Sequence, residues 1–197
     1  MKLRYKLLHA VVLTLATSSA FAAENNAGQI HFTGELVEPS CVIQGAGNTT
    51  DSTVPLGTYP ISLFNDGGVG TESPLKAFTI TLADCPVTTV GLPQVQLTFS
   101  GPHTLTGTNT LLDVSQISTV AGGSKPVAAG VGIAISPEGQ DDKLLTMDAA
   151  EDQVYINLPD VTGDTIRASF NARYISFADD TSAGAADADM TVNIVYH

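Results

Sequence analysis

The residues best able to do chemistry in this chain are two cysteines, Cys41 and Cys85. They lack the C-x-x-C spacing of a redox pair, and no histidine lies near either one as a metal ligand would. The start of the chain, described below, indicates that the protein is exported. In an exported protein, two such cysteines favour one structural disulfide. That bond would close a loop of about 44 residues and stabilise the fold by roughly 4 kcal/mol. We therefore predict a disulfide between Cys41 and Cys85, in preference to a redox pair or a metal site.

The remaining candidate catalytic and metal-binding residues are scattered. After the first residues, the histidines are His31, His103 and His197, and none accompanies a serine or cysteine in a nucleophile motif. Acidic pairs at residues 141–142 and 179–180 lack the spacing of an EF-hand loop, so we interpret them as solvated turns. The sequence predicts no catalytic residue, no metal site and no cofactor.

The first 22 residues, MKLRYKLLHAVVLTLATSSAFA, have the pattern of a secretory signal. A basic start precedes a short apolar run and the small-x-small site Ala20-Phe21-Ala22. The alternative is a membrane anchor, but the apolar run is short and polar residues follow it at once. We predict a mature chain that begins at Ala23 and does not insert into a membrane.

The charge of the mature chain excludes one class of partner. Three of the 8 Lys and Arg residues lie in the signal, which holds none of the 20 Asp and Glu residues, so the mature net charge is −15. A nucleic-acid surface needs clustered basic residues to displace counterions. We therefore expect no nucleic-acid partner and a single domain of about 175 residues.

Strand-like alternation of apolar and polar residues runs through most of the chain, with turn-forming runs such as FNDGGVGTESP and DDTSAGAAD between the strands. Residues 103–119 have no clean period and fit either a short helix or a long crossover. The pattern is typical of an all-β antiparallel sandwich or barrel. The strand-like segments are IHFTGEL (30–36), AFTITLADC (77–85), QVQLTFSG (94–101), GVGIAIS (130–136), QVYINLP (153–159), TIRASFNARY (165–174) and the end of the chain (190–196).

The two ends carry the most information. Residues 23–29 are small and polar, and after them Ile30, Phe32, Gly34 and Leu36 share one face of a strand. A glycine within a strand marks a bulge or a close backbone approach. This segment is therefore either an ordinary first strand with a kink or a strand that leaves its own domain. At the other end, a half-buried strand formed by Met190, Val192, Ile194 and Tyr196 needs a partner to pair with.

Taken in order, these segments closely resemble the type 1-like fimbrial pilins of the chaperone–usher pathway of Gram-negative bacteria. The resemblance covers the whole mature chain, including an apolar-x-Phe-x-Gly pattern in IHFTGEL. It also includes SAGAADADMTVNIVYH, in which Gly184 is the fourteenth residue from the end and Tyr196 the penultimate one. The other matching motifs are VEPSCVI, VPLGTY, FTITLADC, VQLTFSGP, GVGIAI and FNARYIS.

The resemblance implies an incomplete immunoglobulin-like sandwich that lacks its last strand and is completed by a donor strand from a chaperone or the next subunit. It implies a signal peptide (1–22), an N-terminal extension that serves as donor strand (23–38) and a pilin domain (39–197). The donor residues would be Ile30, Phe32, Gly34 and Leu36. The groove edge and chaperone contact would comprise Gly184, Met190, Val192, Ile194 and Tyr196.

The implied function is that of a structural subunit, not an enzyme. A periplasmic chaperone, an outer-membrane usher and other pilin subunits would be its partners in a head-to-tail fibre on the cell surface that is used for adhesion. Whether it is a major or a minor subunit stays open. One alternative is a one-domain tip or minor subunit that itself binds a ligand. A secreted enzyme or small-ligand binder on a β-sandwich is a third possibility, but no catalytic constellation supports it.

Overall fold

The computed structural model describes residues 30–33, 41–44, 52–114 and 126–196. The chain divides into two compact units, Met1–Leu36 and Val37–His197. The predicted signal peptide lies outside the described residues. The fold set out below belongs to the second unit.

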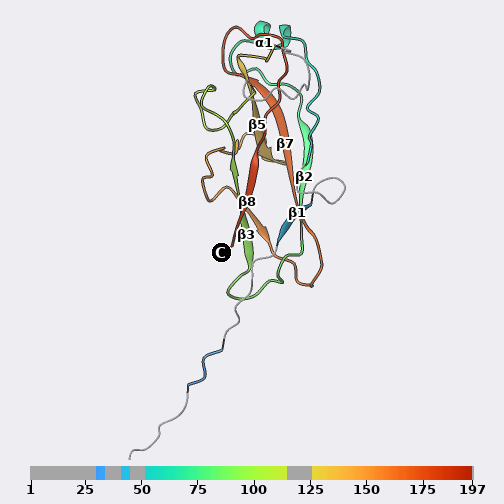
Figure 1. Ribbon diagram of the computed structural model, residues 1–197, viewed down its shortest axis with the longest axis vertical. Coiled ribbons are helices and arrows are strands. Elements are labelled where there is room, and N and C mark those ends of the chain that lie inside the picture. The colour runs from blue at the N-terminus through green and yellow to red at the C-terminus, as the bar shows by residue number, and fades with distance from the viewer. Residues whose placement is uncertain (1–29, 34–40, 45–51, 115–125, 197) are drawn as a thin grey trace, which may run out of the picture. The chain divides into compact units, whose positions relative to one another are not determined.

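Two antiparallel sheets form the body of this unit (Figure 1). The larger sheet has the order β1 (Val42–Gln44), β2 (Lys76–Ala83), β7 (Ile166–Ser176), β5 (Val131–Pro137) and β4 (Leu112–Asp113). The smaller sheet has the order β6 (Val154–Asn157), β3 (Gln94–Ser100) and β8 (Thr191–Tyr196). The prediction of an all-β sandwich is confirmed.

Alternating apolar side chains form the core because every second residue of a strand points to the same face. Leu97 and Phe99 of β3 and Phe170 of β7 are almost completely buried. The rings of Phe99 and Phe170 meet edge to face at 5.8 Å, and Phe78 of β2 stacks on Phe170 at 5.5 Å. Such aromatic contacts add to the free energy gained by burying apolar surface.

The strand predictions are confirmed for six segments, which correspond to β2, β3, β5, β6, β7 and β8. The short strands β1 and β4 were not predicted. The turn prediction for FNDGGVGTESP is partly wrong, because a helix, α1 (Ser62–Gly67), covers its first four residues. This helix ends at Gly68, which has φ 74° and whose backbone N–H donates to the carbonyl of Phe64. Residues 103–111 contain turns that lead into β4 rather than a helix.

The directions of the strands define two poles, which are used below. We call α1 with residues 126–130 and 177–186 the upper pole, at the top of Figure 1. The lower pole comprises residues 84–93 and 158–165, together with the start of β1 and the end of β8. Strand β8 runs in the direction from the upper pole toward the lower pole, and its partner β3 runs in the opposite direction.

Candidate functional site

The last strand, β8, is an edge strand of the smaller sheet. Among the described residues it forms a ladder with β3 only, from the pair Val95 and Tyr196 to the pair Ser100 and Thr191. Its other side therefore presents backbone N–H and C=O groups without a strand partner in the described part of the chain. An exposed edge of this kind is a template for pairing with another strand.

The inner face of β8 is apolar but only half-buried. Val192 and Ile194 pack against the core, whereas their cross-strand partners Phe99 and Leu97 are completely buried. Met190 and Tyr196 are half-buried in the same way, and Thr191 and Asn193 point outward and are exposed. The alternation predicted for this strand is confirmed, and its apolar face is incompletely covered.

The edge strand of the larger sheet, β1, meets β8 at the lower pole. The backbone N–H of Cys41, directly before β1, donates a hydrogen bond of 2.9 Å to the hydroxyl of Tyr196. Cys41 is also joined by a disulfide to Cys85, just beyond the end of β2, as the sequence predicts. The two sheet edges therefore lie on the same side of the sandwich, and Tyr196 bridges them.

The predicted donor residues are described only in part. Residues 30–33 belong to no strand, and Ile30 and Phe32 are 81% and 92% exposed. Burying these two large apolar side chains against a partner would be favourable. Gly34 and Leu36 lie outside the described residues, so their role stays a prediction.

Gly184 does not lie on β8 but on the segment that leads into it. A Cβ atom at this position would collide with the backbone of Val127 and Ala128 and with the carbonyl of Pro126. The two segments are bonded here, because the N–H of Ala128 donates to the carbonyl of Ala185 at 2.8 Å. Close backbone contact thus accounts for this glycine, and its predicted role in a groove edge or chaperone contact stays untested.

Tyr174 of β7 also holds the segment that leads into β8. Its hydroxyl donates a hydrogen bond of 2.9 Å to the carbonyl of Ala186. Burial is the main cause that raises the pKa of Tyr174 above the ordinary value of 10.0, and the nearby Asp187 carboxylate raises it further. At neutral pH this tyrosine is therefore a protonated donor.

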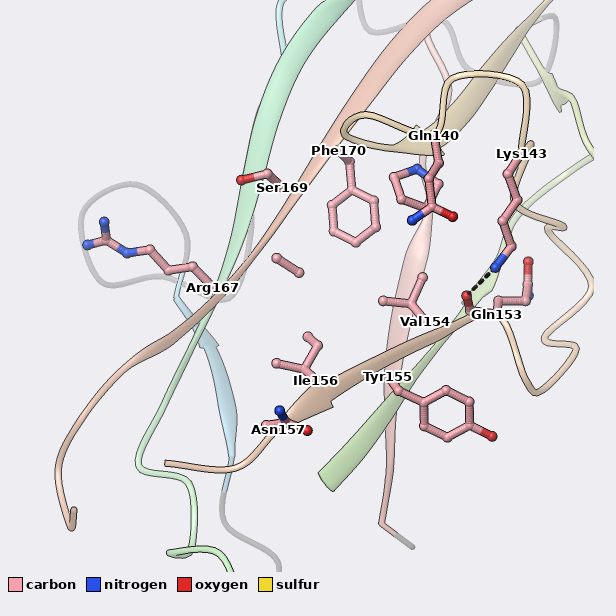
Figure 2. A pocket seen from close by; sticks show the side chains of 12 residues that line it. Gln140, Lys143, Gln153, Val154, Tyr155, Ile156, Asn157, Arg167, Ser169 and Phe170 are labelled. Carbon is pink, nitrogen blue, oxygen red and sulfur yellow. Dashed lines mark hydrogen bonds between the residues drawn. The ribbon is translucent and has the colours of Figure 1, made fainter. Parts of the chain in front are cut away.

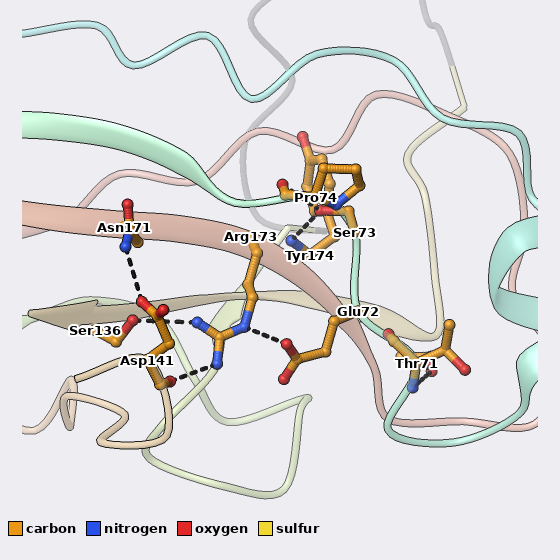
Figure 3. Close-up of polar contacts among 10 residues, drawn as sticks. Thr71, Glu72, Ser73, Pro74, Ser136, Asp141, Asn171, Arg173 and Tyr174 are labelled. Atoms are coloured by element: carbon orange, nitrogen blue, oxygen red, sulfur yellow. Dashed lines mark hydrogen bonds and ion pairs between the residues drawn. The ribbon is translucent and has the colours of Figure 1, made fainter. Parts of the chain in front are cut away.

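A buried arginine on the outer face of the larger sheet was missed by the sequence analysis (Figure 3). The Arg173 side chain is 3% exposed, and its Nε lies 2.7 Å from an oxygen of Glu72. Its other guanidinium nitrogens donate to the Ser136 hydroxyl at 3.1 Å and to the Asp141 carbonyl at 2.8 Å. Alternation in FNARYIS already places Arg173 opposite the core face, but which loops cover it depends on the fold.

Asp141 departs from the prediction of a solvated turn carboxylate. It is half-buried, and its side chain accepts a hydrogen bond of 2.8 Å from the amide of Asn171. With the contact from Arg173 to its carbonyl, Asp141 fixes the loop after β5 over the sheet. Asp142, Asp179 and Asp180 are exposed, as expected of turns.

A pocket of about 380 Å³ opens at the seam between β6 and β7 (Figure 2). Val154, Ile156 and Phe170 point into it, whereas Tyr155 and Arg167 point away. At one end, the Lys143 ammonium donates to the backbone carbonyl of Gln153 at 3.3 Å. The lining offers neither a nucleophile beside a base nor a pair of facing carboxylates, so it does not have the layout of a catalytic site.

The described part of the chain holds no cluster of three or more His, Cys, Asp or Glu side chains that could bind a metal ion. His103 turns its Nδ1 to the carbonyl of Gly101 at 2.9 Å, and His31 is exposed. Over the same residues, no helix is long and apolar enough to cross a membrane.

Comparison of the sequence with known proteins identifies a family for this chain. The model of the family described as "Fimbrial protein" matches residues 30–197. The type-1 fimbrial protein subunit of Serratia marcescens is 37% identical, over 96% of each chain. The probable major fimbrial subunit LpfA of Escherichia coli O157:H7 is 32% identical, over 93% of this chain and 92% of that protein.

The fold has solved counterparts as well. The crystal structure of the P pilus rod subunit PapA superposes with a TM-score of 0.56 at 18% identity, over 80% of this chain and 99% of that one. The expected immunoglobulin-like pilin sandwich is thereby confirmed as the fold. Since the family match spans nearly all of the predicted mature chain and the two relatives align over more than nine-tenths of their length, the chain belongs to the fimbrial protein family and is a subunit of a surface fimbria.

Proposed function

We propose that the open edge of β8 is an acceptor site, and that residues 30–36 of another copy bind there as a donor strand. The observation that carries this proposal is that two apolar surfaces are incompletely buried, one on β8 and one in the N-terminal segment. The apolar inner face of β8 is half-covered, and Ile30 and Phe32 are exposed. An added strand would pair with the free edge of β8 and place its apolar side chains over the core, which is the strand-addition mode of recognition that chaperones also use to complement pilins.

Burial of the donor side chains would supply a large favourable contribution to assembly, to which backbone pairing with β8 adds. Burying Ile30, Phe32 and Leu36 at about 1.5–3 kcal/mol each amounts to roughly 5–9 kcal/mol before the entropy of ordering the strand is subtracted. Gly34 would face a shallow part of the site, where a side chain has no room. Because each copy donates at one place and accepts at another, the association does not close on itself and produces a fibre.

The same open edge explains why partners are needed before assembly. An uncovered edge strand above a partly exposed core is an aggregation hazard in the periplasm. A periplasmic chaperone would cover β8 first, and an outer-membrane usher would be the place where the donor strand of the next copy replaces it. Met190, Val192, Ile194 and Tyr196 would contact both partners in turn. This function needs no catalysis, and we propose none.

A peptide of residues 23–37 tests the acceptor site. Added to the mature chain at about 100 times its Kd, it should stabilise the fold by about 2.7 kcal/mol. For a chain of this size that corresponds to a rise in Tm of roughly 5–10 °C. The same peptide with Gly34→Val is the matched control and should leave Tm unchanged.

Two outcomes would contradict the proposal: a mature chain that stays monomeric with a Tm indifferent to the peptide, or equal effects of both peptides. Electron microscopy of cells that express the chain with its chaperone and usher adds a second measurement. Abundant rods would indicate a major subunit, and sparse incorporation into another subunit's fibre would indicate a minor one.

A further inference from the structure

We infer that consecutive copies in the fibre also touch pole to pole. The contact would join Val90 and Val161 of one copy to Ile61 and Val69 of the next. This inference rests on the proposed donor-strand assembly, and it adds a second surface to that joint. Its partner is another copy of this chain.

The direction of β8 determines which poles meet. Strand β8 begins at Thr191, at its end nearer the upper pole, and ends at Tyr196, at the lower pole. Every ladder between the named strands is antiparallel, so a strand that completes the sandwich in the same manner must run opposite to β8. The donor chain would therefore enter at the acceptor's lower pole and leave at its upper pole.

The length of chain that follows the donor strand forces the two copies together. The proposed donor segment ends at Leu36, and Cys41, five residues later, lies directly before β1 at the lower pole of the donor copy. Five residue steps span at most roughly 18 Å even when fully extended. The lower pole of the donor copy is thus held against the upper pole of the acceptor copy.

The lower pole presents apolar side chains that its own core does not use. Val90 is fully exposed at the tip of the loop between β2 and β3, and Val161 is exposed in the loop between β6 and β7. The two loops are bonded to each other, because the N–H of Thr88 donates to the carbonyl of Pro159 at 2.8 Å. They therefore present both valines from one joined surface.

The upper pole presents a matching pair. Ile61 and Val69 flank α1 and are exposed, whereas Phe64 of the same helix is buried in the core. The turn that carries Val69 is held by Ser176, whose hydroxyl donates to the carbonyl of Gly68 at 2.6 Å and accepts from the N–H of Thr71 at 3.0 Å. This fixed turn can pack against a neighbour without a large loss of conformational entropy.

Charge at the two poles opposes the contact, so the attraction must be apolar. Salt screens such like-charge repulsion between exposed carboxylates, and the contact should therefore tighten as ionic strength rises. The exposed carboxylates are Asp84, Asp160 and Asp164 at the lower pole and Asp66, Asp179 and Asp180 at the upper pole.

A photo-crosslinker placed at position 90 tests the contact in assembled fibres of the mature chain. After illumination and digestion, mass spectrometry should find position 90 joined to residues 61–69 of another copy, with a higher yield at 0.5 M than at 0.05 M salt. The same probe at position 155, on the exposed side of β6, is the matched control and should not reach residues 61–69.

Variants of the acceptor copy give the second measurement. Ile61→Asp with Val69→Asp should abolish the crosslink from position 90 while fibres still form, because the donor strand is untouched. Crosslinks from position 90 to residues 84–93 of the neighbour would mean parallel insertion and would overturn the inference. So would fibres in which position 90 reaches neither pole.

The two proposals fail in different ways. If neither fibres nor a peptide-induced rise in Tm are observed, donor-strand assembly itself is wrong and the pole contact falls with it. If fibres form and the peptide binds but position 90 does not meet residues 61–69, only the pole contact is wrong.

Discussion

The hydroxyl of Tyr196, the penultimate residue, accepts a 2.9 Å hydrogen bond from the backbone N–H of Cys41, 155 residues earlier in the chain. Cys41 directly precedes β1 and forms the disulfide to Cys85, and Tyr196 ends the strand proposed to accept a donor strand. One hydrogen bond therefore links the start of β1 to the lower end of β8.

Removing this bond should weaken the junction without disrupting the core. We expect Tyr196→Phe to destabilise the fold by about 0.5–1.5 kcal/mol, the usual net contribution of one hydrogen bond. Amide hydrogen exchange at Cys41 should become faster, while exchange within β3 should not. Tyr155→Phe, on the exposed face of β6, is the control. Unchanged exchange at Cys41 would show that the bond does not hold the junction.

Tyr196 should also matter before assembly. Tyr196→Ala removes the hydrogen bond and part of the apolar face of β8, so we expect weaker binding to the periplasmic chaperone and a lower periplasmic yield. Quantitative blotting of periplasmic extracts measures this yield. Normal yield together with normal fibres would count against β8 as the chaperone-binding edge.

The close backbone contact at Gly184 predicts that one added methyl group lowers the free energy of unfolding. Gly184→Ala should destabilise the fold by about 1–3 kcal/mol, because the new Cβ meets the backbone of Val127 and Ala128 and cannot be relieved by a side-chain rotation. Gly91→Ala is the matched control, since a Cβ there meets nothing within 4 Å. Urea unfolding of both variants measures the difference, and equal midpoints would refute the steric account.

The ion pair between Arg173 and Glu72 predicts that neutralising Glu72 destabilises the fold more than neutralising an exposed, unrelated carboxylate. Glu72→Gln should cost about 1–3 kcal/mol, because it leaves the buried guanidinium without its counter-charge, although Glu72 itself is 47% exposed. Glu151→Gln, at an exposed loop position, should change stability by less than about 0.5 kcal/mol. The measurement is thermal unfolding of the monomer. A loss in Glu72→Gln no larger than in the control would show that the pair contributes nothing to stability.

The raised pKa of Tyr174 predicts a loss of stability at alkaline pH. In the unfolded chain this tyrosine loses its proton near pH 10, but in the folded chain it does so only at higher pH. Its contribution is therefore complete below about pH 10 and is lost as the pH rises through the folded pKa. Tm measured from about pH 9 to 11.5 should fall more steeply in the parent chain than in Tyr174→Phe. If Tm fell equally steeply with pH in the parent chain and in Tyr174→Phe, Tyr174 would not be the source of the alkaline loss of stability.

A variant of the exposed Tyr155 serves as the control in that experiment. A hydrogen bond to Asp152 is the main cause that raises its pKa, but the side chain lies in solvent and should contribute little to the pH dependence. Tyr155→Phe should therefore follow the parent curve. If the Tyr155→Phe curve matched that of Tyr174→Phe instead, the loss of stability at alkaline pH would be due to Tyr155 and Asp152 at the surface.

Much of the fold follows from local patterns. Alternation located β3, β7 and β8, because a half-buried strand needs one apolar face and its residues point to that face at every second position. The pairing of Cys41 with Cys85 followed from there being two cysteines in an exported chain. The strands β1 and β4 were missed because three or two residues are too short to show a period.

The sequence by itself determined the all-β class, the apolar face of Val192 with Ile194, and the family, because these depend on residue type and spacing. Tertiary structure alone decided that β8 is an edge, that Tyr196 reaches Cys41, and that Gly184 lies against Val127. Each of these relationships joins segments far apart in the chain. Which sheet edge stays open depends on how the strands are ordered in space, and no local pattern encodes that order.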